Sequence, residues 1–257
     1  MEEHPTPTAR GTAHRWLSRR HPRQDAEVQL FCLPYAGSGT SAFHGWSDSF
    51  GQRVEVSAVR LPGRENRLRE RPEVDPAAVA RAIDAAAEKP YALFGHSMGA
   101  RLAFEVIREL RHAGRPLPLR LYPSALGPPD QRIGSLFDGA SRLPDDELAE
   151  RAVAAGGLPA AVLTMPGMLA VFLPALRADL RWVDEYGYVP GEPLPIPVVA
   201  FAGTADPMAP GSAMTGWAAH TSSRFTLHEL PGNHFFLHDN VSAIASIIEA
   251  DLFGDQG

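Results

Sequence analysis

The stretch FGHSMGA, residues 94–100, places Ser97 between Gly95 and Gly99 at the end of a short apolar run. A serine in the pattern G-x-S-x-G can act as a nucleophile when a sharp strand-to-helix turn exposes its hydroxyl. That turn strains the serine backbone and requires very small neighbours two residues to either side, which Gly95 and Gly99 provide. The same pattern also arises by chance in a glycine-rich chain, so its position in the fold decides its meaning.

A serine hydroxyl needs a general base and an orienting carboxylate before it can attack at neutral pH. In folds with this motif the carboxylate follows the serine along the chain and the histidine follows the carboxylate. Asp206 is the candidate for the carboxylate, and His234 is the candidate for the base. Asp206 follows an apolar run that ends at Gly203, and His234 follows the next run, which ends at Leu230. We therefore predict that Ser97 is the nucleophile, that His234 is the general base and that Asp206 orients the imidazole.

An oxyanion formed on Ser97 would be stabilised by two backbone amides. The Met98 amide opens the helix predicted after Ser97, where unpaired N–H groups favour an anion. The second amide is expected from the loop LPYAGSGTSAF, and Ala36 is the predicted donor. The alternative for this loop is an ordinary glycine-rich turn.

Other titratable residues have simpler interpretations. His96 lies inside the turn and is expected to pack structurally, whereas His238 is expected at the surface or as a cap of the last helix. Asp179 and Asp184 fall on an apolar helical segment, where a solvated face is the expected position. The other histidines show no spacing typical of metal ligands, so no metal site is predicted. Cys32 is the single cysteine of the chain, so no internal disulfide is predicted.

Strands and helices are predicted to alternate along most of the chain. Apolar runs predict strands over residues 28–33, 54–61, 91–94, 119–126, 197–203 and 224–230. Helical spacing of apolar residues predicts helices from about residue 75, from residue 98 and over residues 212–219 and 241–252. This order predicts an α/β fold whose mainly parallel sheet carries helices on both faces. The carboxyl ends of parallel strands share one edge, where Ser97, Asp206 and His234 are expected to meet.

Residues 128–190 interrupt this alternation, because they show helical signals alone. Such an insertion is the usual position of a lid over an active site. We predict an α/β core made of residues 26–127 and 191–257, preceded by a flexible arm over residues 1–25. Four apolar residues of the insertion recur at helical spacing and would either line an acyl chamber or pack on the core: Met165, Leu169, Phe172 and Leu176.

Composition narrows the possible classes of function. The chain has 257 residues, of which 44% are hydrophobic and 21% charged, and its net charge is −6. The negative charge gives no attraction to nucleic acid or to an anionic membrane. The N-terminus lacks the apolar core of a signal peptide, and the most apolar stretch, residues 160–176, is too short and too interrupted to span a bilayer. A soluble, cytoplasmic, monomeric protein is expected.

Five stretches carry a resemblance that runs from about Trp16 to the last helix, nearly the whole chain: LFCLPYAGSG, VRLPGRENRL, YALFGHSMGARLAFE, FLPALRADLRWVDEY and ELPGNHFFLHD. Together they resemble the type II thioesterases of polyketide and nonribosomal peptide biosynthesis. The resemblance implies an α/β-hydrolase fold with a helical lid, and a stand-alone enzyme that removes acyl groups from the phosphopantetheine thiol of carrier proteins on stalled or mis-primed synthases. It implies no cofactor, because the phosphopantetheine arm belongs to the partner. It also implies the same triad, with the amides of Met98 and Ala36 as the oxyanion hole.

Two other functions stay open at this point. One is a carboxylesterase or lipase that acts on free esters, and the other is a non-catalytic module that binds carrier proteins. A run of arginines in this acidic chain could dock an acidic carrier domain, but internal ion pairs with Glu65, Glu70 and Glu73 are the favoured interpretation. The arginines are Arg60, Arg64, Arg67, Arg69 and Arg71.

Overall fold

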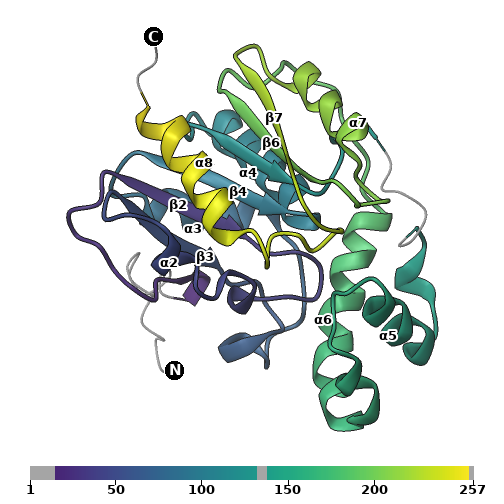
Figure 1. The fold of residues 1–257 in the computed structure, drawn as a ribbon. Helices are drawn as coiled ribbons and strands as arrows, with labels where there is room; N and C mark the ends of the chain where they lie inside the picture. The colour runs from purple at the N-terminus through teal and green to yellow at the C-terminus, as the bar shows by residue number, and fades with distance from the viewer. Residues whose placement is uncertain (1–14, 132–137, 255–257) are drawn as a thin grey trace.

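A seven-stranded sheet forms the centre of the molecule in the computed structural model, which describes residues 15–131 and 138–254 (Figure 1). Its strand order is β1-β3-β2-β4-β5-β6-β7. The strands are β1 (Leu17–Ser18), β2 (Val28–Leu33), β3 (Val54–Val59), β4 (Tyr91–His96), β5 (Leu121–Ser124), β6 (Val198–Gly203) and β7 (Phe225–Leu230). Neighbouring strands are parallel except for β1, which pairs antiparallel with β3. The predicted fold class is confirmed.

Helices cover both faces of this sheet. The α-helices of the described residues are α2 (Trp46–Ser49), α3 (Pro76–Ala86), α4 (Met98–His112), α5 (Asp145–Ala154), α6 (Pro166–Asp184), α7 (Gly211–Met214) and α8 (Val241–Phe253). Short 3₁₀ helices add η1 (Thr40–Phe43), η2 (Glu65–Arg67), η3 (Ala140–Arg142), η4 (Ala160–Thr164) and η5 (Thr215–His220). The helix predicted over residues 212–219 is thus two short pieces, α7 and η5.

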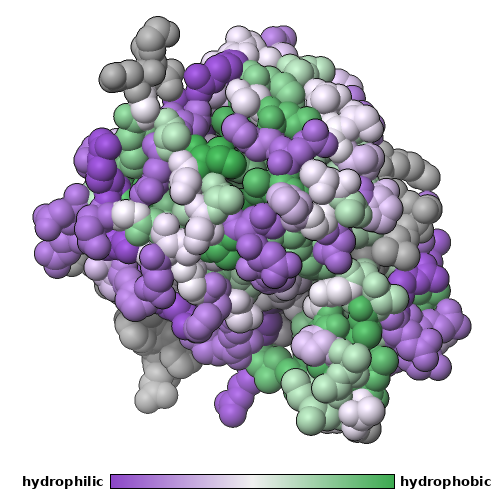
Figure 2. All heavy atoms as spheres, in the orientation of Figure 1, coloured by the Kyte–Doolittle hydropathy of each residue, from purple (hydrophilic) through white to green (hydrophobic). Residues whose placement is uncertain are grey.

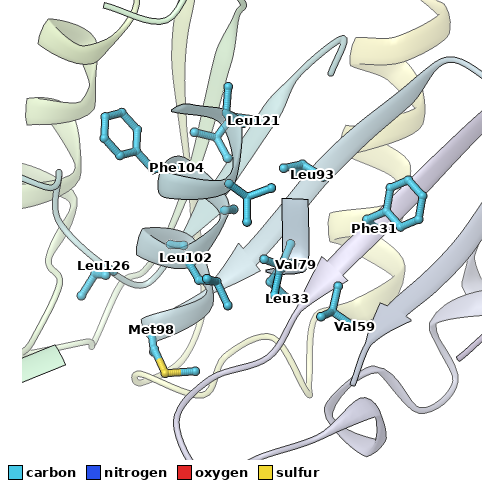
Figure 3. Close-up of a cluster of buried hydrophobic side chains, with 14 of the residues drawn as sticks. Phe31, Leu33, Val59, Val79, Leu93, Met98, Leu102, Phe104, Leu121 and Leu126 are labelled. Atoms are coloured by element: carbon cyan, nitrogen blue, oxygen red, sulfur yellow. The ribbon is translucent and has the colours of Figure 1, made fainter. Parts of the chain in front are cut away.

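Alternating side chains of the strands build two separate hydrophobic layers. Phe31 and Leu33 of β2 join a cluster with α3 and α4, part of which is drawn in Figure 3. Leu30 and Cys32 point to the opposite face and pack with α2 and α8. Because both faces of β2, β3 and β4 are covered, these strands are buried throughout, including their polar residues Gln29, Glu55 and Ser57.

The segment between β5 and β6 contributes η3, α5, η4 and α6, which we call the helical insertion (described residues 138–190). Figure 1 shows α5 and α6 beside one end of the sheet. The insertion has a small core of its own, to which Leu148, Leu173 and Leu180 belong. Figure 2 shows hydrophobic side chains gathered on the surface of this part of the molecule, where Met165, Met168 and other large apolar residues are exposed.

The flexible arm predicted for residues 1–25 needs a correction at its C-terminal part. Residues 1–14 lie outside the described residues. Leu17, however, is only 6% exposed and pairs with Val59 in the two-residue strand β1. A strand of two residues is too short to show a periodic pattern, so it could not be predicted from the sequence. Within the described residues, no helix combines the length and apolar character needed to cross a bilayer.

Candidate active site

Ser97 occupies a sharp turn between β4 and α4. Its backbone angles, φ 52° and ψ −121°, are ones that residues with a side chain rarely adopt. A Cβ on Gly95 would lie 2.1 Å from the carbonyl oxygen of Gly99, and a Cβ on Gly99 would lie 2.2 Å from that of Leu33. Both glycines are therefore required because neighbouring backbone fills the space where a side chain would stand.

A chain of hydrogen bonds joins Ser97, His234 and Asp206. His234 Nε2 is 3.0 Å from Ser97 Oγ, and His234 Nδ1 is 2.8 Å from Asp206 Oδ2. Since a carboxylate only accepts hydrogen bonds, Nδ1 carries the ring proton, and Nε2 is free to accept the serine proton. Asp206 Oδ1 accepts the Met208 amide at 2.8 Å, which fixes the orientation of the carboxylate.

The three residues come from the same edge of the sheet, as the sequence predicted. Ser97 follows β4, Asp206 lies three residues after β6, and His234 lies four residues after β7. The side chain of Asp206 is fully buried and that of His234 is 7% exposed, whereas Ser97 opens to a cavity. Shielding from water strengthens the Asp206–His234 interaction, so this geometry can activate a serine hydroxyl.

Two amides next to Ser97 are free to bind an anion. Ala36 and Met98 line the same cavity as Ser97 and His234. Met98 begins α4, so its amide has no acceptor within the helix. Among the described residues, no hydrogen bond to the Ala36 amide is found either. The next amide of this loop, that of Gly37, instead donates to Asp179 Oδ2 at 2.7 Å.

The cavity beside Ser97 has a volume of about 40 Å³ and mainly apolar walls. The helical insertion supplies Ala152, Gly157, Leu158, Phe172, Leu176, Leu180 and Val183, and the core adds Tyr35 and Phe235. Of the four insertion residues predicted for an acyl chamber, Phe172 and Leu176 line this cavity. Met165 and Leu169 do not, and Met165 is 49% exposed, so the prediction is corrected for these two. Leu180 and Val183 continue the helical spacing beyond Leu176, so extending the same pattern would have predicted them for the cavity wall.

His96 lies next to the catalytic candidates but is fully buried. Its Nδ1 is 2.9 Å from Ser124 Oγ, and its Nε2 is 2.9 Å from the carbonyl oxygen of His234. Burial lowers the pKa of His96 well below its ordinary value. The structural packing role predicted for His96 is confirmed. His238 is exposed, with Nε2 3.3 Å from the hydroxyl of Tyr35.

The solvated face predicted for Asp179 is wrong. Its side chain is fully buried and forms an ion pair with Arg64 at 2.7 Å. Asp184 is partly buried and accepts the amides of Gly139 and Ser141. Only the three-dimensional fold brings Asp179 to Arg64, which lies 115 residues earlier in the chain.

The arginine run mainly forms ion pairs within the molecule. Arg60 pairs with Glu65 at 3.2 Å and Arg67 pairs with Glu70 at 2.7 Å. These pairs agree with the favoured interpretation of the sequence. Arg69 and Arg71 are exposed, so docking of an acidic partner stays a prediction for those two. Among the described residues, no group of three or more His, Cys, Asp and Glu side chains is arranged to hold a metal ion.

Comparison with known proteins agrees with this geometry. The family model described as "Thioesterase domain" matches residues 28–252, which is most of the chain. The chain belongs to the thioesterase family. This thioesterase is 34% identical over 231 residues to the gramicidin S biosynthesis protein GrsT of Aneurinibacillus migulanus, covering 88% of the chain and 90% of the relative.

Solved structures narrow the family further. The thioesterase is similar to RedJ, a thioesterase of the prodiginine pathway in Streptomyces coelicolor, with 38% identity, a TM-score of 0.79 and coverage of 88% and 92% of the two chains. It is also similar to BorB, the type II thioesterase from the borrelidin cluster, with 36% identity, a TM-score of 0.81 and coverage of 92% and 97%. The resemblance to type II thioesterases of polyketide and nonribosomal peptide pathways is thereby confirmed.

Proposed function

We propose that this thioesterase hydrolyses acyl thioesters carried on the phosphopantetheine arm of carrier proteins, and so clears stalled or mis-primed synthases. The observation that supports this proposal best is the hydrogen-bonded chain from Asp206 through His234 to Ser97, which ends at an apolar cavity. An activated serine beside an apolar cavity suits a substrate that joins an acyl chain to a thiol leaving group.

In the first half-reaction Ser97 Oγ attacks the thioester carbonyl carbon while His234 Nε2 takes the hydroxyl proton. The carbonyl oxygen becomes an oxyanion, which the amides of Met98 and Ala36 stabilise by hydrogen bonds. The C–S bond then breaks, and the proton on His234 passes to the departing thiolate. Asp206 remains ionised and stabilises the imidazolium between these two proton transfers.

In the second half-reaction water attacks the acyl-enzyme. His234 Nε2 takes a proton from the water as its oxygen bonds to the acyl carbon, and the same two amides bind the second oxyanion. The bond to Ser97 Oγ breaks, the imidazolium returns its proton to the serine, and a free carboxylic acid leaves. No cofactor enters this scheme, because the phosphopantetheine group is part of the substrate.

We expect the acyl group to enter the cavity beside Ser97, because the walls from Phe172, Leu176 and Leu180 are apolar. A larger hollow adjoins this cavity and shares Tyr35, Leu158 and Phe172 with it. We expect the helical insertion to act as a lid, because it contributes more than half of the residues that line the cavity.

The proposal is tested by hydrolysis of a panel of acyl-loaded carrier proteins, with p-nitrophenyl esters of the same acyl chains in parallel. We expect a higher kcat/KM for carrier-bound thioesters than for free esters, and loss of both activities in Ser97→Ala. A preference for free esters would instead indicate a carboxylesterase. Carrier binding with hydrolysis unchanged by Ser97→Ala would contradict the catalytic role of this serine.

A further inference from the structure

A buried ion pair connects the helical insertion to the loop that holds Ala36. Asp179 of α6 accepts two hydrogen bonds from Arg64, Nη1 to Oδ2 and Nη2 to Oδ1, both at 2.7 Å. The Asp179 side chain is fully buried and that of Arg64 is 6% exposed. Such a paired, planar geometry holds two segments in a fixed relative orientation.

The same two residues hold the backbone of the loop after β2 from both sides. Asp179 Oδ2 accepts the amide of Gly37 at 2.7 Å, and Arg64 Nη1 donates to the carbonyl of Ser38 at 2.7 Å. Arg64 Nε also donates to the carbonyl of Pro62 at 3.3 Å. The loop therefore cannot shift without breaking a charge-assisted hydrogen bond that is shielded from water.

Packing against side chains of α6 also restrains the loop after β2. Gly37 has a φ of +77°, and a Cβ at this position would lie 3.0 Å from both Leu176 and Phe172. These two side chains also line the cavity beside Ser97. Asp179 occupies the Gly37 amide, whereas Ala36, one residue earlier, lines the cavity, and its amide has no hydrogen-bond acceptor among the described residues.

We propose that Asp179 and Arg64 are positioning residues for the oxyanion hole, an inference that rests on the proposed function of Ser97. By fixing Gly37 and Ser38, the ion pair holds the Ala36 amide where the oxyanion forms. Because Asp179 is on α6, the helical insertion takes part in transition-state stabilisation in addition to lining the cavity. Neither residue touches the reacting atoms.

The test compares Asp179→Asn with Asp184→Asn, two substitutions five residues apart on one helix. Asp184 accepts the amides of Gly139 and Ser141 within the insertion, and among the described residues none of its hydrogen bonds reaches the Ala36 loop. Asp179→Asn removes the charge that Arg64 requires and puts an NH₂ group against its N–H donors. We expect kcat to fall about 10- to 100-fold with KM changed less than about threefold, and Asp184→Asn to keep kcat within about twofold.

Affinity for an alkylboronic acid supplies a readout that a purely structural role would not change. Its boron bonds to Ser97 Oγ, and the resulting tetrahedral adduct places an oxygen where the oxyanion forms. We expect Asp179→Asn to weaken its binding in proportion to the loss in kcat. Unchanged inhibitor affinity, or an equal loss of kcat in Asp184→Asn, would overturn the proposal.

Asp179→Glu and Arg64→Lys keep the charge but displace the hydrogen bonds, so they provide the test if Asp179→Asn does not fold. Both are expected to lower kcat and boronate affinity together, and a folded Asp179→Glu with full kcat would contradict the proposal. Ser97→Ala separates the two claims. If Ser97→Ala abolishes hydrolysis while all Asp179 and Arg64 variants retain kcat, the positioning role is contradicted but the proposed function is not. If Ser97→Ala still hydrolyses the substrate, the proposed function itself is contradicted.

Discussion

Two histidine–serine pairs lie side by side in this molecule, and only one of them is equipped for catalysis. The pairs are His234–Ser97, at 3.0 Å, and His96–Ser124, at 2.9 Å, and the two imidazole rings are 5.5 Å apart. In both pairs the ring nitrogen that faces the serine is the acceptor, because the other nitrogen donates to an oxygen. A short serine–histidine distance therefore does not by itself identify a nucleophile.

The groups behind each imidazole make the difference. His234 donates to the carboxylate of Asp206, which stabilises a positive charge on the ring, whereas His96 donates to the neutral carbonyl of His234. Burial lowers the pKa of His96 well below its ordinary value, so its ring is a weaker base than an ordinary imidazole. Ser97 opens to a cavity on a strained turn, while Ser124 is buried in β5. The comparison indicates that a carboxylate and access to substrate distinguish the reactive pair.

The largest expected effect separates the two serines directly. Ser97→Ala should lower kcat/KM for acyl thioesters by about 10⁴-fold or more, because it removes the nucleophile. Ser124→Ala removes the hydroxyl of the buried pair and should keep kcat/KM within about threefold. Steady-state hydrolysis assays on both variants measure this, and an equal loss in the two would refute the distinction.

Substitution of Asp206 tests the carboxylate. Asp206→Asn keeps the shape of the side chain but removes the charge that stabilises the imidazolium and the acceptor that selects the Nδ1–H tautomer. We expect kcat to fall by about 10³- to 10⁴-fold with the fold intact. Circular dichroism serves as the control for folding. A variant with near-normal kcat would show that His234 works without its carboxylate.

The buried pair should matter for stability. His96→Phe leaves the hydroxyl of Ser124 and the carbonyl of His234 without their partner in a water-free environment. The free energy of unfolding should fall by about 2–4 kcal/mol, as measured by urea denaturation. A loss below about 0.5 kcal/mol would mean that the His96 hydrogen bonds contribute little.

The smallest effect concerns the pH dependence of stability. Because the pKa of folded His96 is lowered, the unfolded chain binds this proton below about pH 6.5 and the folded chain does not. The free energy of unfolding should therefore decrease as pH falls from about 6.5, by up to about 1.4 kcal/mol per pH unit from this group. His96→Gln should show a shallower decrease than the wild type. Burial also lowers the pKa values of His228 and His238, so only the difference between the two proteins isolates His96.

That Ser97, Asp206 and His234 lie together could be predicted from the sequence, because the signals for it are local. Strand ends, glycines and chain order are enough to predict that Ser97, Asp206 and His234 meet at one edge, and the structure brings them together. Phe172 and Leu176 could be predicted for the cavity wall by spacing, but the same spacing included Met165, whose side chain is exposed and does not line the cavity.

Tertiary partners could not be predicted from one sequence. Asp179 looks like an ordinary surface carboxylate on a helix until Arg64 is seen beside it, and no periodicity connects two residues 115 positions apart. Strand β1 was missed for a related reason, because Leu17 is held in place by its partner Val59 in β3 rather than by a pattern of its own.

Active-site labelling with a fluorophosphonate tests the central claim most directly. The reagent phosphonylates an activated serine oxygen with loss of fluoride, and peptide mapping by mass spectrometry identifies the modified residue. We predict complete modification of Ser97, loss of hydrolysis in step with it, and no modification of Ser124. Labelling at another serine, or full hydrolytic activity after Ser97 has been phosphonylated, would contradict the account.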